Sequence, residues 1–272
     1  MPMIRLIATD MDATLLDDKS EVTPRTARAV TRAMEAGARF VIASGRMYET
    51  ARPYAELLNA NAPMIAFNGA MACDWQTGAP LFKTAIPAET AREVCAMAEA
   101  RGVFIQYFPE RGLFYARRDP AVSDEYESRV RYRGTETGEP LSAWIKDAPL
   151  KLLCLGKHAP LLALREAVCE AFPGLKLMFS RPTYLEIVSG EVDKGKALRA
   201  VAEQLGIRRE EIAAFGDADN DLGMLTYAGQ GYAMANSSEE VLARVPRHAR
   251  ANTDDGVARV LEELLARGEI GG

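Results

Sequence analysis

Near its N-terminus the chain reads Met3-Ile4-Arg5-Leu6-Ile7-Ala8-Thr9-Asp10-Met11-Asp12-Ala13-Thr14. The short aliphatic run, broken by charge only at Arg5, is typical of a buried parallel strand. Open α/β sheets bind ligands at the carboxyl ends of such strands, and here Asp10 and Asp12 follow the strand directly. Two carboxylates this close repel each other unless a cation joins them. By itself the stretch indicates a metal site and a solvated strand end equally well.

Composition limits the class of protein. The chain has 272 residues, 48% apolar and 26% charged, which allows one large domain or two ordinary ones with ample core. A net charge of −5 provides no basic stripe, so we expect no nucleic-acid partner. No apolar run approaches membrane-spanning length and no signal peptide precedes the first strand, so we expect a cytoplasmic protein without membrane contact.

Cysteine and histidine chemistry is not expected. The cysteines are far apart and form no C-x-x-C pair, which is typical of buried thiols in a reduced compartment; they are Cys73, Cys95, Cys154 and Cys169. The two histidines, His158 and His248, lack an acidic or nucleophilic neighbour, and no G-x-S-x-G elbow occurs. A Ser-His-Asp mechanism is therefore not indicated.

Strands and helices alternate at the start of the chain. A helix is predicted from Thr23-Pro24, a strand at residues 39–43 that stops at Ser44, a helix from Tyr48 and a strand at 64–67. This order predicts a parallel sheet with crossover helices.

Hairpins replace this alternation in the middle of the chain. Residues 103–116 and 175–188 each read as two short strands around a turn, and the alternating pattern resumes at Asp193. We therefore predict a split α/β core with an inserted α+β domain. The expected limits are 1–82 for the first part of the core, 83–188 for the insert and 189–272 for the second part.

Three predicted strands end in polar residues. Asp10 and Asp12 follow the first, Ser44 the second, and the loop Gly216-Asp217-Ala218-Asp219-Asn220-Asp221 a third. The ends of parallel strands share one sheet edge, and Lys194 at a helix start adds an amine. Carboxylates tolerate a phosphate only with a hard cation between them, so the set indicates metal-assisted phosphoryl transfer.

The same segments resemble a known family. Asp10-Met11-Asp12-Ala13-Thr14, Ser44, Lys194-Gly195 and the 216–221 loop look like the four ordered motifs of the haloacid dehalogenase-like (HAD) phosphatases. Ala43-Ser44-Gly45-Arg46, Asn68-Gly69-Ala70 and Ala233-Met234-Ala235-Asn236 are similar to the Cof-type subfamily. The resemblance implies a Rossmann-like parallel-sheet core with an inserted α+β cap domain.

The resemblance also implies roles for individual residues. Asp10 would be the nucleophile, Asp12 the general acid and base, Ser44 a ligand of the phosphoryl group and Lys194 its countercharge. Acid catalysis by Asp12 requires a raised pKa beside an ionised Asp10, so we expect opposite environments for the two carboxylates. Other residues are expected to bind substrate, namely Gly45, Arg46, Asn68, Asn220 and Asn236. Mg²⁺ would be held by Asp10, Asp12 through its carbonyl, Asp217 and Asp221.

The implied activity is Mg²⁺-dependent hydrolysis of small phosphorylated metabolites, sugar phosphates or similar, through an aspartyl-phosphate, by a monomer or homodimer. The alternatives are a phosphomutase and a sugar-phosphate sensor without turnover. An EF-hand reading of Asp217, Asp219 and Asp221 fails because Leu222 and Ala228 stand where glycine and glutamate are needed.

Two positions depart from the family pattern. Ala13 and Ala235 stand where glycine is usual. Alanine resists positive φ, so these loops must either use ordinary backbone angles or carry slight strain.

Overall fold

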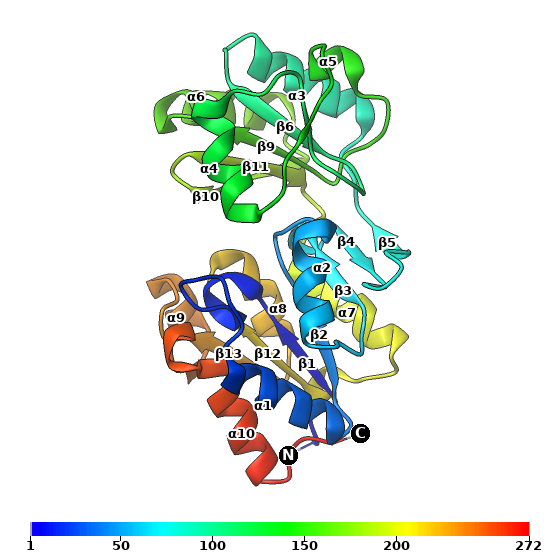
Figure 1. The fold of residues 1–272 in the computed structure, drawn as a ribbon, viewed down its shortest axis with the longest axis vertical. Coiled ribbons are helices and arrows are strands. Elements are labelled where there is room, and N and C mark those ends of the chain that lie inside the picture. Colours follow the sequence, from blue (N-terminus) through cyan, green and yellow to red (C-terminus); the bar gives the residue numbers. More distant parts are fainter. Residues whose placement is uncertain (1, 272) are drawn as a thin grey trace. The chain divides into compact units, whose positions relative to one another are not determined.

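The computed structural model describes residues 2–271, which fold into two compact units. Of the described residues, the first unit contains 2–46, 51–82 and 193–271. The second contains residues 47–50 and 83–192. Figure 1 labels the helices and strands of both.

The first unit is built on a parallel sheet with the strand order β14-β13-β12-β1-β2. Every neighbouring pair is parallel, and Ala8 of β1 stands between Ala214 of β12 and Val41 of β2. The strands are β1 (Leu6–Thr9), β2 (Arg39–Ile42), β12 (Ile212–Gly216), β13 (Gln230–Met234) and β14 (Arg247–Ala249). An isolated parallel bridge from Ala43 to Ile65 leads to a small second sheet of β3 (Met64–Ala66), β4 (Met71–Cys73) and β5 (Pro80–Lys83).

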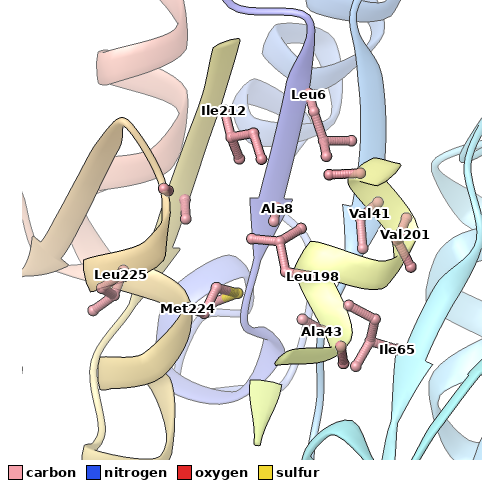
Figure 2. Packing of buried hydrophobic residues seen from close by; sticks show 14 of the residues in the cluster. Leu6, Ala8, Val41, Ala43, Ile65, Leu198, Val201, Ile212, Met224 and Leu225 are labelled. Carbon is pink, nitrogen blue, oxygen red and sulfur yellow. The ribbon is translucent and has the colours of Figure 1, made fainter. Parts of the chain in front are cut away.

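Helices cover both faces of the parallel sheet. On one face, α7 (Lys194–Gln204) and α8 (Leu222–Tyr227) bury aliphatic side chains against β1, β2 and β12, as Figure 2 shows for Leu198, Met224 and Leu6. On the other face, α1 (Pro24–Glu35) and α10 (Gly256–Ala266) pack together (Figure 1). α9 (Glu239–Arg244) also belongs to this unit, as does α2 (Tyr48–Leu57) from Ala51 onward. The result is the three-layer α/β core that the sequence predicts.

The predicted N-terminus of α1 is confirmed. The Oγ1 of Thr23 accepts a hydrogen bond from the backbone N–H of Thr26 at 3.1 Å, and Pro24 occupies the first helical position. A threonine cap satisfies one of the free N–H groups of the first turn, and a proline there costs no hydrogen bond.

The second unit is an α+β fold around a six-stranded sheet of order β10-β11-β9-β6-β7-β8. Its strands are β6 (Phe104–Phe108), β7 (Phe114–Tyr115), β8 (Thr135–Glu136), β9 (Lys151–Leu155), β10 (Leu175–Arg181) and β11 (Tyr184–Ser189). Its helices are α3 (Ala88–Glu99), α4 (Pro120–Val130), α5 (Leu141–Trp144) and α6 (His158–Ala171). Ile105, Leu152 and Ile187 of the sheet pack with α3, α5 and α6 in one core.

Both predicted hairpins are confirmed, as β6–β7 and β10–β11. The short strand β8 lies between these two hairpins in the sequence and pairs in parallel with β7. Within residues 2–271, no helix combines the length and the apolar character needed to cross a membrane.

The core of the first unit depends on Leu198, which is fully buried between α7 and the sheet. We expect Leu198→Ala to lower the free energy of unfolding by about 2–5 kcal/mol, because it leaves a cavity in a packed interior. Leu57→Ala is the matched control, since Leu57 is 64% exposed, and should change stability by less than about 0.5 kcal/mol. Equal effects in urea denaturation would contradict the packing described.

Candidate active site

Three strand ends of the first unit lie at one edge of its sheet. Asp10 follows β1 and donates its backbone N–H to the carbonyl of Phe215 on β12 at 2.9 Å. Ser44 follows β2, and its N–H donates to the carbonyl of Ile65 on β3 at 2.9 Å. Because β2, β1 and β12 are adjacent and parallel, the motif residues at their carboxyl ends converge, as the sequence predicts.

Lys194 joins this edge from the first position of α7. Its side chain is fully buried, and its Nζ donates to Oδ1 of Asp10 at 2.5 Å and to Oδ1 of Asp221 at 2.6 Å. Burial alone would lower the pKa of Lys194, but the two carboxylates outweigh it and raise that pKa above its ordinary value. The ammonium therefore stays charged at neutral pH and forms the centre of the site.

The turn at Gly69 packs against the start of α7 and so fixes the position of Lys194. Phe67, Asn68 and Gly69 all have positive φ, and that of Gly69 is 100°. A Cβ added at Gly69 would come within 2.6 Å of the carbonyl oxygen of Asp193, the N-cap of α7. Only glycine allows this turn to lie so close to the start of the helix that carries Lys194.

Asp221 organises the loop after β12. Its Oδ2 accepts hydrogen bonds of 3.0 Å from the backbone N–H groups of Asp217 and Ala218, while its Oδ1 receives Lys194. A Cβ on Gly216 would come within 2.5 Å of the Asp221 side chain, so the tight turn requires glycine. Both carboxylate oxygens of Asp221 thus accept hydrogen bonds within the site.

Three carboxylates surround the ammonium. One oxygen from each of Asp10, Asp217 and Asp221 lies within 4.8 Å of the others. Burial raises the pKa of Asp10, and Asp221, Asp217 and Asp12 raise it further, although Lys194 lowers it. Burial and Asp221 also raise the pKa of Asp217 to about 6. The single positive charge of Lys194 therefore does not neutralise the three carboxylates.

This donor set fits a hard divalent cation. Lys194 donates to one carboxylate oxygen of Asp10, and the hydroxyl of Thr14 donates to one carboxylate oxygen of Asp217 at 2.8 Å. The second oxygens of Asp10 and Asp217 are then available to a cation, and Mg²⁺ prefers one or two carboxylates together with waters and phosphate oxygens. Asp221 is saturated by protein donors and fits a supporting role around such an ion.

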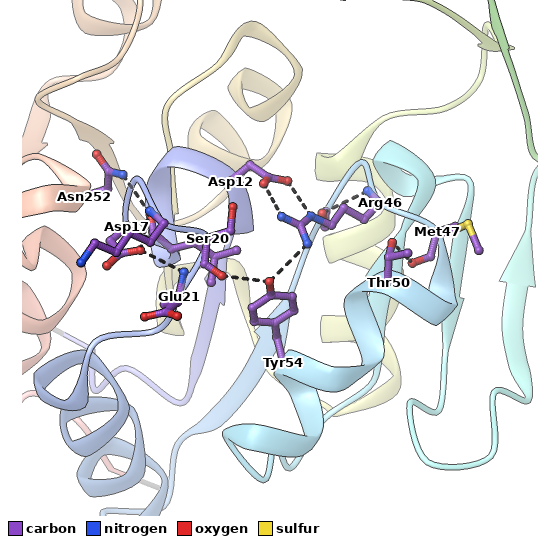
Figure 3. A network of polar contacts seen from close by, with 12 residues as sticks. Asp12, Asp17, Ser20, Glu21, Arg46, Met47, Thr50, Tyr54 and Asn252 are labelled. Carbon is purple, nitrogen blue, oxygen red and sulfur yellow. Dashed lines mark hydrogen bonds and ion pairs between the residues drawn. The ribbon is translucent and has the colours of Figure 1, made fainter. Parts of the chain in front are cut away.

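Asp12 lies in different surroundings (Figure 3). Its side chain is 56% exposed, and Nη2 and Nε of Arg46 donate to its two carboxylate oxygens at 2.6 and 2.9 Å. The Nη1 of Arg46 faces the hydroxyl of Tyr54, which donates to the carbonyl of Ser20 at 2.9 Å. Asp10 is thus buried among charges, whereas Asp12 is exposed and paired with Arg46. The expectation that Asp10 is the readily ionised carboxyl of the pair is wrong, because burial raises the pKa of Asp10.

Arg46 was expected to bind substrate, but its guanidinium is occupied by Asp12 and Tyr54. A bidentate pair of this kind fixes the orientation of a carboxylate. Tyr54 was missed from the sequence, because a tyrosine inside a helix carries no motif signal.

The loop between Asp10 and Leu16 is strained at Ala13, whose φ is 58°. Of the two alternatives drawn from the sequence, strain therefore applies at Ala13, whereas Ala235 keeps an ordinary backbone angle. The amide of Asn236 donates to the carbonyl of Ala13 at 2.8 Å, and its Oδ1 accepts from the N–H of Asn252 at 3.0 Å. Asn236, expected to bind substrate, thus braces the loop, together with Asn252, which the sequence did not reveal.

The remaining predicted residues gather around Asn68. Its Oδ1 accepts from the amide of Asn220 at 2.8 Å, and a Cβ on Gly45 would come within 2.6 Å of the same oxygen. The Oδ1 of Asn220 is buried and has no hydrogen-bond partner within residues 2–271. The buried Ser44 accepts the backbone N–H of Arg46 at 3.1 Å with its Oγ, which leaves the hydroxyl proton free to donate.

The family profile of the haloacid dehalogenase-like hydrolases matches residues 7–261. The chain belongs to this family. The motif residues assembled above therefore confirm the HAD resemblance, and the parallel-sheet core with an α+β insert confirms the fold class.

Relatives of this HAD hydrolase extend along nearly its whole length. It is 30% identical to the HMP-PP phosphatase of Cronobacter sakazakii over 246 residues, covering 90% of this chain and 89% of the relative. It is 28% identical to the pyridoxal phosphate phosphatase YbhA of Escherichia coli, covering 96% and 98%. The crystal structure of a haloacid dehalogenase-like hydrolase from Bacteroides thetaiotaomicron superposes with a TM-score of 0.90 at 27% identity, covering 96% and 99%.

The contact at Gly69 predicts a specific sensitivity. We expect Gly69→Ala to destabilise the first unit and to lower activity, because the added Cβ meets the backbone that starts α7 and displaces Lys194. Gly206→Ala is the matched control: its φ is also positive, at 64°, but nothing lies within 4 Å of the added Cβ. Both variants bear the left-handed penalty of about 1–2 kcal/mol. Equal losses of stability and activity would contradict the positioning role of Gly69.

The crowded carboxylates predict a pH dependence in EDTA. Asp217 has a pKa of about 6 in the folded chain, above its ordinary value of 3.8, so the folded state holds its proton more tightly than the unfolded state does. Stability should therefore fall as pH rises from 5 through about 6, since the unfolded chain then binds fewer protons. At pH 7.5, MgCl₂ should raise the melting temperature by about 3 °C or more. A melting temperature that is equal at pH 5 and 7.5 in EDTA and insensitive to MgCl₂ would contradict the site.

Proposed function

We propose that this HAD hydrolase is a Mg²⁺-dependent phosphatase that hydrolyses small phosphorylated metabolites, sugar phosphates or similar, through an aspartyl-phosphate. The observation that carries the proposal is the contact of 2.5 Å between the buried ammonium of Lys194 and Asp10, inside a group of three carboxylates. A cation and a lysine together give this edge the positive charge that a phosphate dianion needs. Asp10, Asp217 and the carbonyl of Asp12 would hold Mg²⁺, with Asp221 behind them; when bound, it acts as a Lewis acid on the phosphoryl oxygens.

In the first half-reaction, a carboxylate oxygen of Asp10 attacks phosphorus while the bond from phosphorus to the leaving oxygen breaks. Asp12 donates its proton to that oxygen, so the product leaves as an alcohol. Lys194 remains beside Asp10 and offsets the charge that gathers on the phosphoryl group. Asp10 is fixed by the strand β1 and by Lys194, which keeps the attacking atom in place.

In the second half-reaction, water attacks the phosphorus of the aspartyl-phosphate and gives a proton to Asp12. The bond between phosphorus and Asp10 breaks, which releases inorganic phosphate and restores the carboxylate of Asp10 and the protonated side chain of Asp12. Arg46 holds Asp12 through two hydrogen bonds, so we assign it to positioning the proton carrier in place of the substrate contact expected from the sequence.

Ser44 is proposed to contact the phosphoryl group, and Asn220 to contact a hydroxyl of the ligand or a water beside it. The hydroxyl proton of Ser44 and the unpaired buried Oδ1 of Asn220 are both available at the site. A buried polar atom without a partner is costly, which supports a role for Asn220 toward a ligand hydroxyl or water. Gly45 and Asn68 are proposed to shape this corner, and Asn236 to hold the loop.

Small metabolites are proposed as substrates because two relatives are named for them, pyridoxal phosphate in one case and HMP-PP in the other. We also propose that the segment 83–188 serves as the substrate-selecting cap domain. A cytoplasmic location and a monomeric or homodimeric state remain our expectation.

Removal of the nucleophile tests the covalent route. Asp10→Asn should lower phosphate release by at least about 10³-fold, because an amide does not attack phosphorus. The wild type should release inorganic phosphate from several members of a panel of natural monophosphates. Isomerised substrate without free phosphate would indicate a phosphomutase, and binding without either product would indicate a sensor. Undiminished turnover by Asp10→Asn would refute the mechanism.

Removal of the proton carrier should depend on the leaving group. Asp12→Ala should lower kcat/KM for an alkyl phosphate by about 10²-fold or more, and much less for 4-nitrophenyl phosphate, whose leaving group needs no proton. The comparison uses kcat/KM because that ratio reports only the steps up to and including formation of the aspartyl-phosphate. Asp18→Ala is the matched control, since Asp18 is an exposed carboxylate a few residues further along the chain and should keep both rates. Equal losses on both substrates would contradict the acid role of Asp12.

A further inference from the structure

A second hollow lies in the first unit, lined by α1, β13, β14 and α10. Its volume is about 990 Å³, and it is lined by five arginines together with two glutamates: Arg25, Arg247, Arg250, Arg259, Arg267, Glu262 and Glu263. Ala235 of the motif segment 233–236 borders it, but Asp10, Asp217, Asp221, Ser44 and Lys194 do not belong to its lining. The hollow is therefore separate from the site described above.

The excess positive charge around the hollow is opposite in sign to the net charge of the chain. The sequence has 38 acidic and 33 basic residues, yet positive charge exceeds negative charge around this hollow. The two glutamates of the lining are already engaged. Glu262 accepts two hydrogen bonds of 2.6 and 3.0 Å from Arg25, and Glu263 accepts one of 3.4 Å from Arg267.

The other three arginines retain their charge toward the hollow. Arg247 and Arg250 are exposed, and across residues 2–271 their side chains have no hydrogen bond or ion pair. Arg259 donates its Nε–H to the carbonyl of Asp254 at 2.7 Å, which leaves its two terminal amino groups available. Like charges held together in this way are unfavourable unless an anion joins them.

The backbone presents these side chains from fixed positions. Arg247 lies on the edge strand β14 in parallel register with Tyr232 of β13. The segment after β14 is held by Gly256, where an added Cβ would come within 1.9 Å of the carbonyl oxygen of Arg250. Arg259 follows on the first turn of α10. Three arginines of the lining thus come from one strand, one tight turn and one helix.

We propose that this hollow binds the polyphosphate group of a small ligand. A guanidinium matches a phosphate through two parallel hydrogen bonds, and it stays charged at any physiological pH. Three such groups around a hollow at the upper end of the size range of small-molecule sites fit an anion with several linked phosphates better than one phosphate. Free pyrophosphate and a nucleoside triphosphate share this chemistry.

The test is calorimetric titration of the full chain with pyrophosphate and, separately, ATP, in EDTA. Without divalent cations the catalytic carboxylates repel anions, so binding reports the arginine hollow. We expect saturable binding that the double variant Arg247→Gln/Arg250→Gln weakens at least tenfold. The control Arg52→Gln/Arg101→Gln removes the same charge from exposed positions outside the lining and should leave binding unchanged.

Two results would overturn the proposal. One is absence of binding up to 1 mM of either ligand, or equal weakening by the two double variants. The other is binding that survives Arg247→Gln/Arg250→Gln but is lost in Ser44→Ala, which would place the anion at the catalytic edge. Similar affinities for the two ligands would assign the hollow to the polyphosphate group alone, and tenfold tighter binding of ATP would assign it to a nucleotide. The hydrolysis rate of 4-nitrophenyl phosphate serves as the folding control and should be the same in all hollow variants.

Discussion

The site depends on one buried ammonium. Lys194 has no contact with solvent, yet it holds Asp10 and Asp221 at hydrogen-bond distance and thereby joins α7 to the ends of β1 and β12. A charge in this position is tolerated only because it is paired on two sides. The carboxylates in turn tolerate each other only because of Lys194 and of the cation that the site is suited to hold. The contact that stabilises the edge of the sheet is therefore also the one that fixes the position of the Asp10 carboxylate.

Residues that follow strands could be placed from the sequence with little ambiguity. Asp10, Ser44 and Asp217 meet because parallel strands end at one edge, and this consequence of topology needs no side-chain detail. Lys194 could be added because it stands at the start of a predicted helix, next to its N-cap Asp193, which is a local feature. The insert could be recognised from hairpin patterns for the same reason.

Side-chain partners across long sequence distances could not be obtained in this way. The pairing of Arg46 with Asp12 is supported by Tyr54 of α2, and the spacing of these residues in the sequence does not encode it. The bracing of Ala13 by Asn236 and Asn252 likewise depends on how three loops meet. The strain at Ala13 shows the same limit, since the sequence allowed both ordinary and left-handed angles and only packing selects one.

The most direct test of the central ion cluster is the stability of Lys194→Met, measured by urea denaturation at pH 7.5 in EDTA. Removal of the ammonium leaves Asp10 and Asp221 buried without countercharge, so the free energy of unfolding should fall by about 3–5 kcal/mol. Lys196→Met makes the same chemical change at an exposed position two residues further along α7 and should cost far less. The account predicts a large difference between the two variants that shrinks at pH 5, because burial raises the pKa of Asp10 and of Asp217 and both then take up protons. Equal stability of the two variants at pH 7.5 would contradict it.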